Sequence, residues 1–148
     1  PVKDADLISI IPSIAGGVDL SNAPGDDLAV LLPLDPDASA ERIRAALGPG
    51  RAVIISDTFR RPWREGLVDV AIGVAGLAPL RNYIGETDRA GRELQVTVMA
   101  GADQVAAAAG LLMEKDKGQP AVFVEGVAVE GRGGLRDPLR DPRWDLFR

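Results

Sequence analysis

The sequence of 148 residues contains no cysteine and no histidine, and these two absences exclude several kinds of catalytic and metal site. Without cysteine there is no disulfide, no thiolate zinc site and no cysteine nucleophile. Without histidine there is no serine–histidine triad and no imidazole ligand for a metal ion. Oxygen atoms must therefore form any metal site, which favours hard cations such as Mg²⁺, Mn²⁺ or Ca²⁺. Any catalysis must rely on carboxylates, hydroxyls, arginines and backbone amides.

The chain also lacks an excess of basic residues and any long apolar segment. It carries 17 basic and 22 acidic residues, for a formal net charge of −5, whereas nucleic-acid binding needs a basic surface. No apolar run approaches the roughly 20 residues of a membrane span, and the first residues do not resemble a signal peptide. We therefore expect a cytoplasmic protein that binds neither nucleic acid nor membrane. Because the chain begins with Pro1, we also expect a processed or excised piece.

The pattern of apolar residues predicts a single domain over residues 1–148, with about six strands and two helices. One helix is expected within 35–47, where aspartates precede it and glycine follows, and the other within the alanine-rich segment 102–114. Short β-branched and apolar runs predict strands at 7–11, 28–32, 52–55, 67–77, 94–98 and 121–124. Because the helices do not alternate regularly with the strands, this order favours an α+β fold with a mixed, mostly antiparallel sheet.

The strongest candidate site follows the predicted strand 52–55. Polar residues, including Asp57 and Thr58, end this strand, and a basic, aromatic loop comes after them. A carboxylate and a hydroxyl fixed at a strand end suit Mg²⁺ or Mn²⁺ beside a phosphate. Arg61 and Arg64 in the loop can neutralise phosphate or carboxylate oxygens. The alternative interpretation is that the aspartate caps a turn and the arginines are solvated.

Two glycine-containing segments are further candidates. The first offers backbone that can approach a ligand closely, and its polar residues are Asp19, Ser21 and Asn22. An Asx-type turn is the alternative there. The second segment follows the last predicted strand, can present amides to a phosphate, and contains Glu130, Arg132 and Gly133. It matches neither the P-loop nor the dinucleotide motif, so a flexible exposed loop is its alternative.

Taken together, these segments resemble the coenzyme F420-0:γ-glutamyl ligase family, whose members add glutamate to the precursor of a deazaflavin coenzyme. The resemblance extends over nearly the whole chain, and the segment around Asp57 is its most specific part. The segments that carry it are 15–22, 34–40, 55–59, 61–64, 69–76 and 145–148.

The resemblance implies the α+β fold of that family, an intertwined homodimer, and an amide ligase that depends on GTP and on Mg²⁺ or Mn²⁺. In such a ligase the γ-phosphate activates a substrate carboxylate as an acyl phosphate, and the amine of L-glutamate displaces the phosphate. Asp57 would be a metal ligand and Glu130 a further one, while Arg61 and Arg64 would face phosphates or acidic substrate groups. The residues expected to bind the cofactor are Asp19, Ser21, Asn22, Thr58, Arg132 and Gly133.

Departures from the family pattern support a second hypothesis. Arg60 stands where the family usually has glycine, Val98 where it typically has glutamate, and Gln104 in place of the second residue of an Asp-Glu pair. The chain is also expected to lack the family's N-terminal nucleotide-binding segment, which a partner segment would then supply. The alternative function is that of a truncated, non-catalytic paralogue that binds an anionic or deazaflavin-like ligand or serves as an assembly partner.

Overall fold

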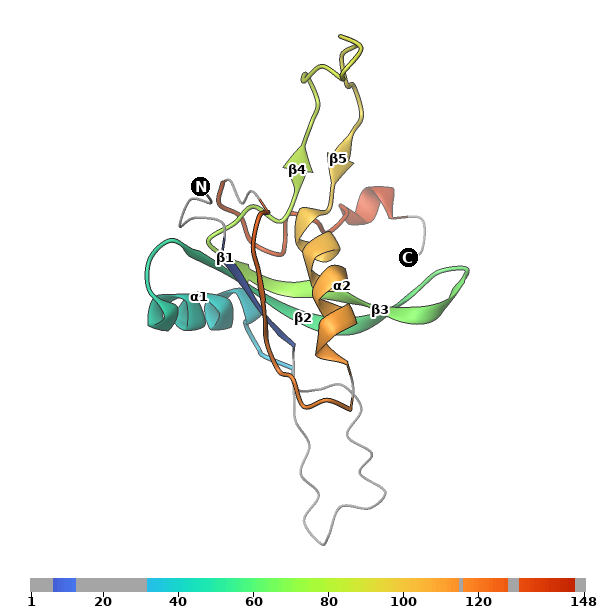
Figure 1. Ribbon diagram of the computed structural model, residues 1–148. Coiled ribbons are helices and arrows are strands. Elements are labelled where there is room, and N and C mark those ends of the chain that lie inside the picture. Colours follow the sequence, from blue (N-terminus) through green and yellow to red (C-terminus); the bar gives the residue numbers. More distant parts are fainter. Residues whose placement is uncertain (1–6, 13–31, 115, 128–130, 146–148) are drawn as a thin grey trace, which may run out of the picture.

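A four-stranded mixed sheet forms the centre of the fold, with one helix on each face (Figure 1). The structure, a computed structural model, describes residues 7–12, 32–114, 116–127 and 131–145. The strand order is β3-β2-β1-β6. The strands are β1 (Leu7–Pro12), β2 (Arg51–Arg61), β3 (Arg64–Ala75) and β6 (Val122–Val124). β1 runs parallel to β2, whereas the other two pairings are antiparallel.

The lengths of the strands differ, and this difference shapes the site. β1 pairs with β2 only from Leu7↔Arg51 to Pro12↔Ser56. β2 continues to Arg61 and turns into β3, so these two long strands form a hairpin that extends past the end of β1. The pairing of the hairpin skips Ile72, which is a β-bulge in β3.

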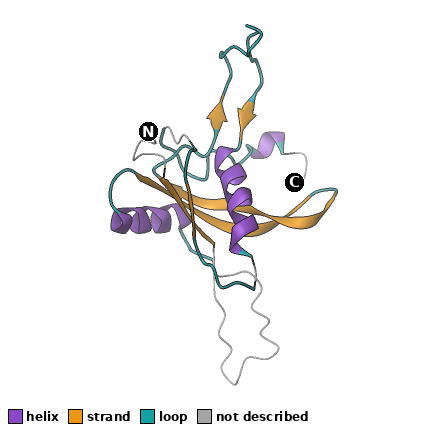
Figure 2. Ribbon diagram, in the orientation of Figure 1, coloured by secondary structure: helices purple, strands orange, loops and turns teal. Residues whose placement is uncertain are grey.

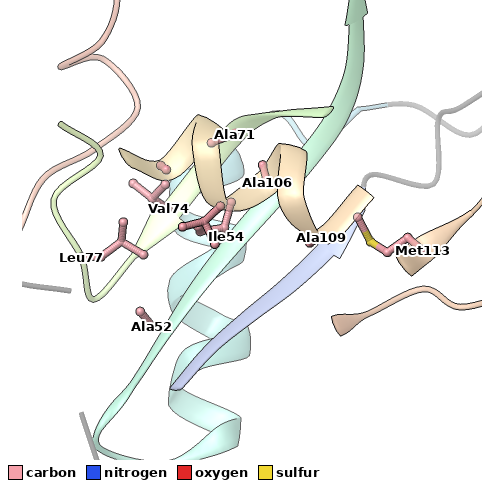
Figure 3. Packing of buried hydrophobic residues seen from close by; sticks show 10 residues of the cluster. Ala52, Ile54, Ala71, Val74, Leu77, Ala106, Ala109 and Met113 are labelled. Carbon is pink, nitrogen blue, oxygen red and sulfur yellow. The ribbon is translucent and has the colours of Figure 1, made fainter. Parts of the chain in front are cut away.

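The two helices cover opposite faces of the sheet because successive side chains of β2 point to opposite sides. Ile54 packs in the cluster under α2 (Gly101–Met113), as Figure 3 shows. Val53 and Ile55 pack in the cluster under α1 (Pro36–Leu47). Both clusters are aliphatic, so small alanines and branched side chains let the helices approach the sheet closely.

The exposed edge of β3 is covered by carboxylates from the first turns of both helices. The backbone N–H of Ala71 donates to Asp103 of α2, with 3.0 Å between N and Oδ1. The N–H of Val74 donates to Asp37 of α1, with 2.8 Å between N and Oδ1. Because a free strand edge can pair with another chain, these two acceptors protect the part of the edge that lies beneath the helices.

A separate two-stranded ribbon extends away from the sheet (Figure 2). It consists of β4 (Arg81–Asn82) and β5 (Val98–Met99), and the connection between them is held by the bridge Thr87↔Glu93. A short 3₁₀ turn, η3 (Pro142–Trp144), lies near the end of the described chain. No helix within the described ranges is long and apolar enough to cross a membrane.

The α+β class, both helices and the strands near 7–12, 52–55, 67–75 and 122–124 agree with the sequence prediction. Two predictions of elements were wrong. The segment 59–66 was expected to be a loop, but most of it pairs within the β2–β3 hairpin. The strand expected at 94–98 is reduced to β5, because most of 94–97 lies in the irregular connection to β4. Most of the strand expected at 28–32 lies outside the described residues.

Candidate functional site

The candidate site lies where β1 ends beside β2. Asp57 and Thr58 were expected at the end of their own strand, and this was wrong: β2 continues to Arg61. The neighbouring strand ends instead, since its last pair is Pro12↔Ser56. Asp57 and Thr58 therefore lie within a continuous strand that is paired with β3, just past the point where the neighbouring strand β1 ends.

Asp57 is the first residue of β2 after the last pair with β1, and its side chain accepts a hydrogen bond from the backbone. Its Oδ1 receives the N–H of Thr58, with 2.8 Å between the heavy atoms. The carboxyl group is partly buried, and its second oxygen makes no hydrogen bond to the described residues. Because an ionised carboxylate offers two acceptor oxygens, Asp57 retains one oxygen that could coordinate a cation or accept a hydrogen bond from a ligand.

Thr58 lies directly opposite Asp69 of β3. The hydroxyl of Thr58 donates to Asp69, and 3.1 Å separates Oγ1 from Oδ1. Asp69 in turn lies against α2 at Gly110, where an added Cβ would collide with its Oδ2. The side chains of Thr58 and Asp69 are thus on the α2 side of the sheet, whereas strand alternation places Asp57 on the other side.

Ser56 is an unusual polar residue beneath α2. It is 0% exposed, and its hydroxyl has no hydrogen-bond partner within the described part of the chain. Most buried polar groups in proteins are hydrogen-bonded. Ser56, Thr58 and Asp69 were not expected to form a group on one face of the sheet, because the sequence did not reveal the pairing of β2 with β3.

Arg61 and Arg64 pair with each other at the tip of the hairpin. Both are exposed, and Arg61 donates weakly to the backbone oxygen of Glu65, with 3.4 Å between the heavy atoms. Arg61 is four residues beyond Asp57, which corresponds to roughly 13 Å along the strand. The structure therefore brings the two arginines together on an arm that projects past the sheet, at a distance from Asp57.

Arg132 and Gly133 line a different region, a cavity of about 520 Å³ between α1 and the end of β3. Its other lining residues are Asp37, Ala38, Glu41, Arg44, Val74, Ala75 and Gly76. Ala75 pairs with Val53, four residues before Asp57. This offset corresponds to roughly 13 Å along β2, so the structure does not group these two predicted residues with Asp57. The predicted residues Asp19, Ser21, Asn22 and Glu130 lie outside the described residues.

The residues that depart from the family pattern occupy exposed positions. Arg60 projects from the hairpin, Gln104 lies on the surface of α2, and Val98 is 43% exposed on β5. Among non-glycine residues of the described ranges, only Trp63 and Glu114 have positive φ. The backbone at Arg60 therefore does not require a glycine.

The described residues do not contain a group of three or more acidic side chains placed to hold a metal ion. Mg²⁺ is nevertheless commonly held by one or two carboxylates together with water and substrate phosphates. The free oxygen of Asp57 fits this kind of site, in which water and phosphates complete the coordination.

Comparison with known proteins connects this chain to one family. The family model described as F420-0:Gamma-glutamyl ligase matches residues 9–126. A relative named coenzyme F420:L-glutamate ligase, from Methanothermobacter thermautotrophicus, is 49% identical over 140 residues, which cover 89% of this chain and 55% of the relative. The proteins with the same name from Natronomonas pharaonis and Archaeoglobus fulgidus are 53% and 43% identical, over 92% and 91% of this chain and 53% and 56% of their own lengths. The chain thus spans about half the length of these relatives.

Proposed function

The chain belongs to the F420-0:gamma-glutamyl ligase family, and on this premise we propose that it performs amide ligation between L-glutamate and a carboxylate of the deazaflavin precursor F420-0. The observation that carries the proposal is the extent of the similarity. Relatives named as this ligase match about nine-tenths of the chain at 43–53% identity. The matched region includes Asp57, Thr58 and the whole of β2, the strand on which they lie.

The proposed chemistry is phosphoryl activation of a carboxylate. The γ-phosphate of GTP passes to the substrate carboxylate with release of GDP, the amine of glutamate attacks the acyl carbon, and phosphate leaves as the amine loses a proton. Each step requires stabilisation of negative oxygens more than a strong side-chain nucleophile. A chain without cysteine or histidine is suited to this reaction because carboxylates, arginines and backbone amides supply what it needs.

Mg²⁺ or Mn²⁺, when bound, would neutralise charge on the phosphate oxygens. We assign the free carboxylate oxygen of Asp57 to holding that cation, and we retain Thr58 as a nucleotide contact. Arg61 and Arg64 on the projecting arm would attract phosphate or acidic substrate groups. We also retain Glu130 as a metal ligand, and as nucleotide or substrate contacts Asp19, Ser21, Asn22, Arg132 and Gly133.

We further propose that the protein acts as a cytoplasmic homodimer. The projecting β2–β3 hairpin supports this idea, because an isolated two-stranded ribbon has little stability of its own. Its apolar side chains are open to solvent: Phe59 and Leu67 are 58% and 56% exposed, and Trp63 is 88% exposed. A second copy, or a partner segment from the rest of a longer ligase, would cover these side chains.

The direct test is to incubate the purified chain with F420-0, L-glutamate, GTP and Mn²⁺ or Mg²⁺ and to measure the product by mass spectrometry. We expect product that is heavier by one glutamate residue, with release of GDP and phosphate in equal amounts. The reaction should stop when a chelator removes the divalent cation. Absence of the glutamylated product under all of these conditions would contradict the proposal.

The departures at Arg60, Val98 and Gln104 favour one alternative, a non-catalytic relative that binds an anionic or deazaflavin-like ligand or assists assembly. The two functions differ in turnover rather than in binding. Fluorescence titration with F420-0, which contains the deazaflavin chromophore, separates them when it is combined with the product assay. Binding of F420-0 without turnover would support the alternative, whereas turnover by this chain alone would eliminate it.

A further inference from the structure

A groove lies where α1 begins, between that helix, β3 and the C-terminal segment. Its volume is about 490 Å³, which is within the range of pockets that bind cofactor-sized molecules. The residues that give the groove its character come from all three parts of the chain: Leu34, Pro36, Ile72, Leu135, Arg136 and Leu139. None of them was selected as a site residue from the sequence.

The groove lies near Asp57 because α1 begins just short of that residue. Gly73 pairs with Ile55 and lies against the start of α1, where an added Cβ would collide with the helix. Near the other end of the helix, Arg44 Nε donates to the backbone oxygen of Arg51 at 2.9 Å. The helix therefore covers β2 from Arg51 to Ile55. Asp57 is two residues further along β2, on the same face.

Ile72 connects the groove to Asp57. Its side chain packs with the apolar cluster beneath α1, so it lies on the Asp57 face of the sheet. Ile72 is two residues from Val70, the partner of Asp57, which corresponds to roughly 7 Å along the strand. A molecule that fills the groove and extends past Ile72 therefore reaches the free carboxylate oxygen of Asp57.

The surface of the groove is mainly apolar, and leucines border it in exposed positions. Leu34 and Leu139 are both exposed to solvent, whereas Ile72 and Leu135 are partly buried. Burial of such apolar area by a ligand is favourable. The groove thus offers a binding surface for a flat apolar group.

The charged residues of the groove leave one arginine available. Both carboxylate oxygens of Asp37 accept backbone N–H groups, from Val74 and Leu135, and Asp35 accepts the N–H of Ala38. The side chain of Arg136 is exposed and has no hydrogen bond or ion pair with the residues that the structure describes. A guanidinium can grip an acidic group in two places and can also stack on an aromatic ring.

These features favour one of the proposed substrates over the others. Among the described residues that line the groove, one arginine stands against two carboxylates, which does not suit the triphosphate of a nucleotide. L-Glutamate is too small and too polar for a surface bordered by leucines. The deazaflavin acceptor combines a flat, fused aromatic ring with an acidic end, and both parts match the groove and its position.

We propose that the groove at the start of α1 binds the fused aromatic ring of the deazaflavin acceptor, with the reacting carboxylate extending past Ile72 towards Asp57. The ring lies against Leu34 and Leu139, and Arg136 stacks on it or pairs with an acidic group of the acceptor. The inference rests on the proposed function, because that function supplies the acceptor. It adds the place where the acceptor binds and the residues that select it.

The direct test is methyl NMR of the full chain during titration with F420-0, in the absence of the other substrates. An aromatic ring shifts the signals of the methyl groups that it contacts. We expect the methyl signals of Leu34, Ile72 and Leu139 to shift, whereas those of Leu111 on α2, at the opposite face of the sheet, should not. GTP with Mg²⁺ in a separate titration should leave the groove signals unchanged.

Substitutions at exposed positions of the groove give an independent measurement. Leu34→Glu and Leu139→Glu should each raise the Kd for F420-0 by about 10-fold or more, because the ring would have to bury a charge. Leu111→Glu places the same charge at an exposed leucine of α2 and should leave the Kd unchanged. Fluorescence titration with F420-0 gives the Kd, and circular dichroism verifies the fold of each variant.

Arg136→Ala tests the cation of the groove. Loss of a charged partner should raise the Kd for F420-0 by roughly 10-fold. Arg89→Ala is the matched control, since it removes one positive charge at an exposed position between β4 and β5 and should not change the Kd.

The outcomes separate this inference from the proposed function. Groove signals that do not move with F420-0, groove signals that move with GTP instead, or an equal loss of affinity in Leu111→Glu would each overturn the groove as the ring site. Formation of glutamylated product would leave the ligase proposal intact in all three cases. Conversely, groove signals that shift with F420-0 in a protein that forms no product would support the groove and contradict the ligase.

Discussion

Asp37 and Leu135 are 98 residues apart in the sequence, yet the backbone N–H of Leu135 donates to Asp37 Oδ2 with 2.9 Å between the heavy atoms. The other carboxylate oxygen of Asp37 accepts the N–H of Val74 at 2.8 Å. One side chain on the first turn of α1 thus connects the edge of β3 to the C-terminal segment. An added Cβ at Gly134 would lie 2.8 Å from Asp37 Oδ2, so glycine there allows the close approach.

Replacement of Asp37 by alanine should therefore destabilise the protein strongly. Two partly buried N–H groups would lose their acceptor, and each such loss costs roughly 1–3 kcal/mol. We expect the free energy of unfolding to fall by about 2–4 kcal/mol in urea denaturation. Glu41→Ala on the same helix is the control, since its salt bridge to Arg44 is exposed and should contribute less than about 1 kcal/mol. Equal losses in the two variants would contradict this interpretation.

Ser56→Ala should have the opposite effect and stabilise the fold. The Ser56 hydroxyl is fully buried without a partner in the described structure, and such a group costs roughly 1–3 kcal/mol. Since alanine removes that cost and leaves only a small void, we expect a gain of about 1 kcal/mol in thermal or urea denaturation. Ser39→Ala serves as a comparison, because the Ser39 hydroxyl donates a hydrogen bond to the backbone oxygen of Asp35. Its removal should therefore bring no gain in stability. A clear loss of stability in Ser56→Ala would indicate that its hydroxyl has a partner.

The sequence predicted the helices well because their signals are local. Asp35 accepts the N–H of Ala38 at the start of α1, and Gly48 follows its end with a φ of +92°, as a capping residue and a terminal glycine predict. The sequence also indicated the Asp57 segment as a candidate site, since its polar residues directly follow an apolar run. These features depend on neighbours within a few residues.

The contacts around the site could not be predicted because they depend on pairing between distant residues. A regular hairpin would not place Thr58 opposite Asp69, because the register shifts by two residues next to the turn, between Arg61↔Arg64 and Arg60↔Leu67. This shift changes which residues lie opposite each other, so the group formed by Ser56, Thr58 and Asp69 is not apparent in the sequence. The roles of Asp37 and Asp103 at the edge of β3 are hidden for the same reason.

Gly73→Ala should be poorly tolerated because α1 begins directly against β3. An added Cβ would lie 2.5 Å from the backbone carbonyl carbon of Pro36, which cannot move without the start of the helix. Overpacking of this kind typically costs about 1–3 kcal/mol, measurable by thermal unfolding. Gly101→Ala is the matched control, since its nearest atom would be Pro79 O at 3.8 Å and its φ is not positive. Similar melting temperatures for the two variants would show that α1 can shift.

The connection between β4 and β5 should lose order in acid because of Asp88. The hydrogen bond from the backbone N–H of Arg92 is the main reason that the pKa of Asp88 lies below its ordinary value of 3.8, and the N–H of Ala90 and the side chain of Arg92 contribute as well. A lowered folded-state pKa gives stability above the ordinary pKa that is lost as pH falls through the folded-state value. Backbone NMR of residues 83–97 should therefore show increasing disorder below about pH 4.

Asp88→Asn provides the control for this acid transition. The amide cannot ionise, so the order of the connection should no longer change with pH in the acid range. The salt bridge from Arg92 to Asp88 would also be absent in the variant at neutral pH. An identical acid transition in the wild type and the variant would assign the effect to another group.

Asp57→Asn tests the centre of the proposed site. The substitution keeps an oxygen that can accept the N–H of Thr58 but removes the negative charge that would hold a divalent cation. We expect kcat/KM for glutamate addition to fall by about 10²- to 10³-fold, the usual result of removing one preorganised electrostatic group. A higher Mn²⁺ concentration should restore part of this activity, because the loss arises from weaker cation binding. Glu65→Gln, at an exposed position of the same hairpin, should leave kcat/KM unchanged. Wild-type activity in a folded Asp57→Asn variant would move the cation site elsewhere in the chain.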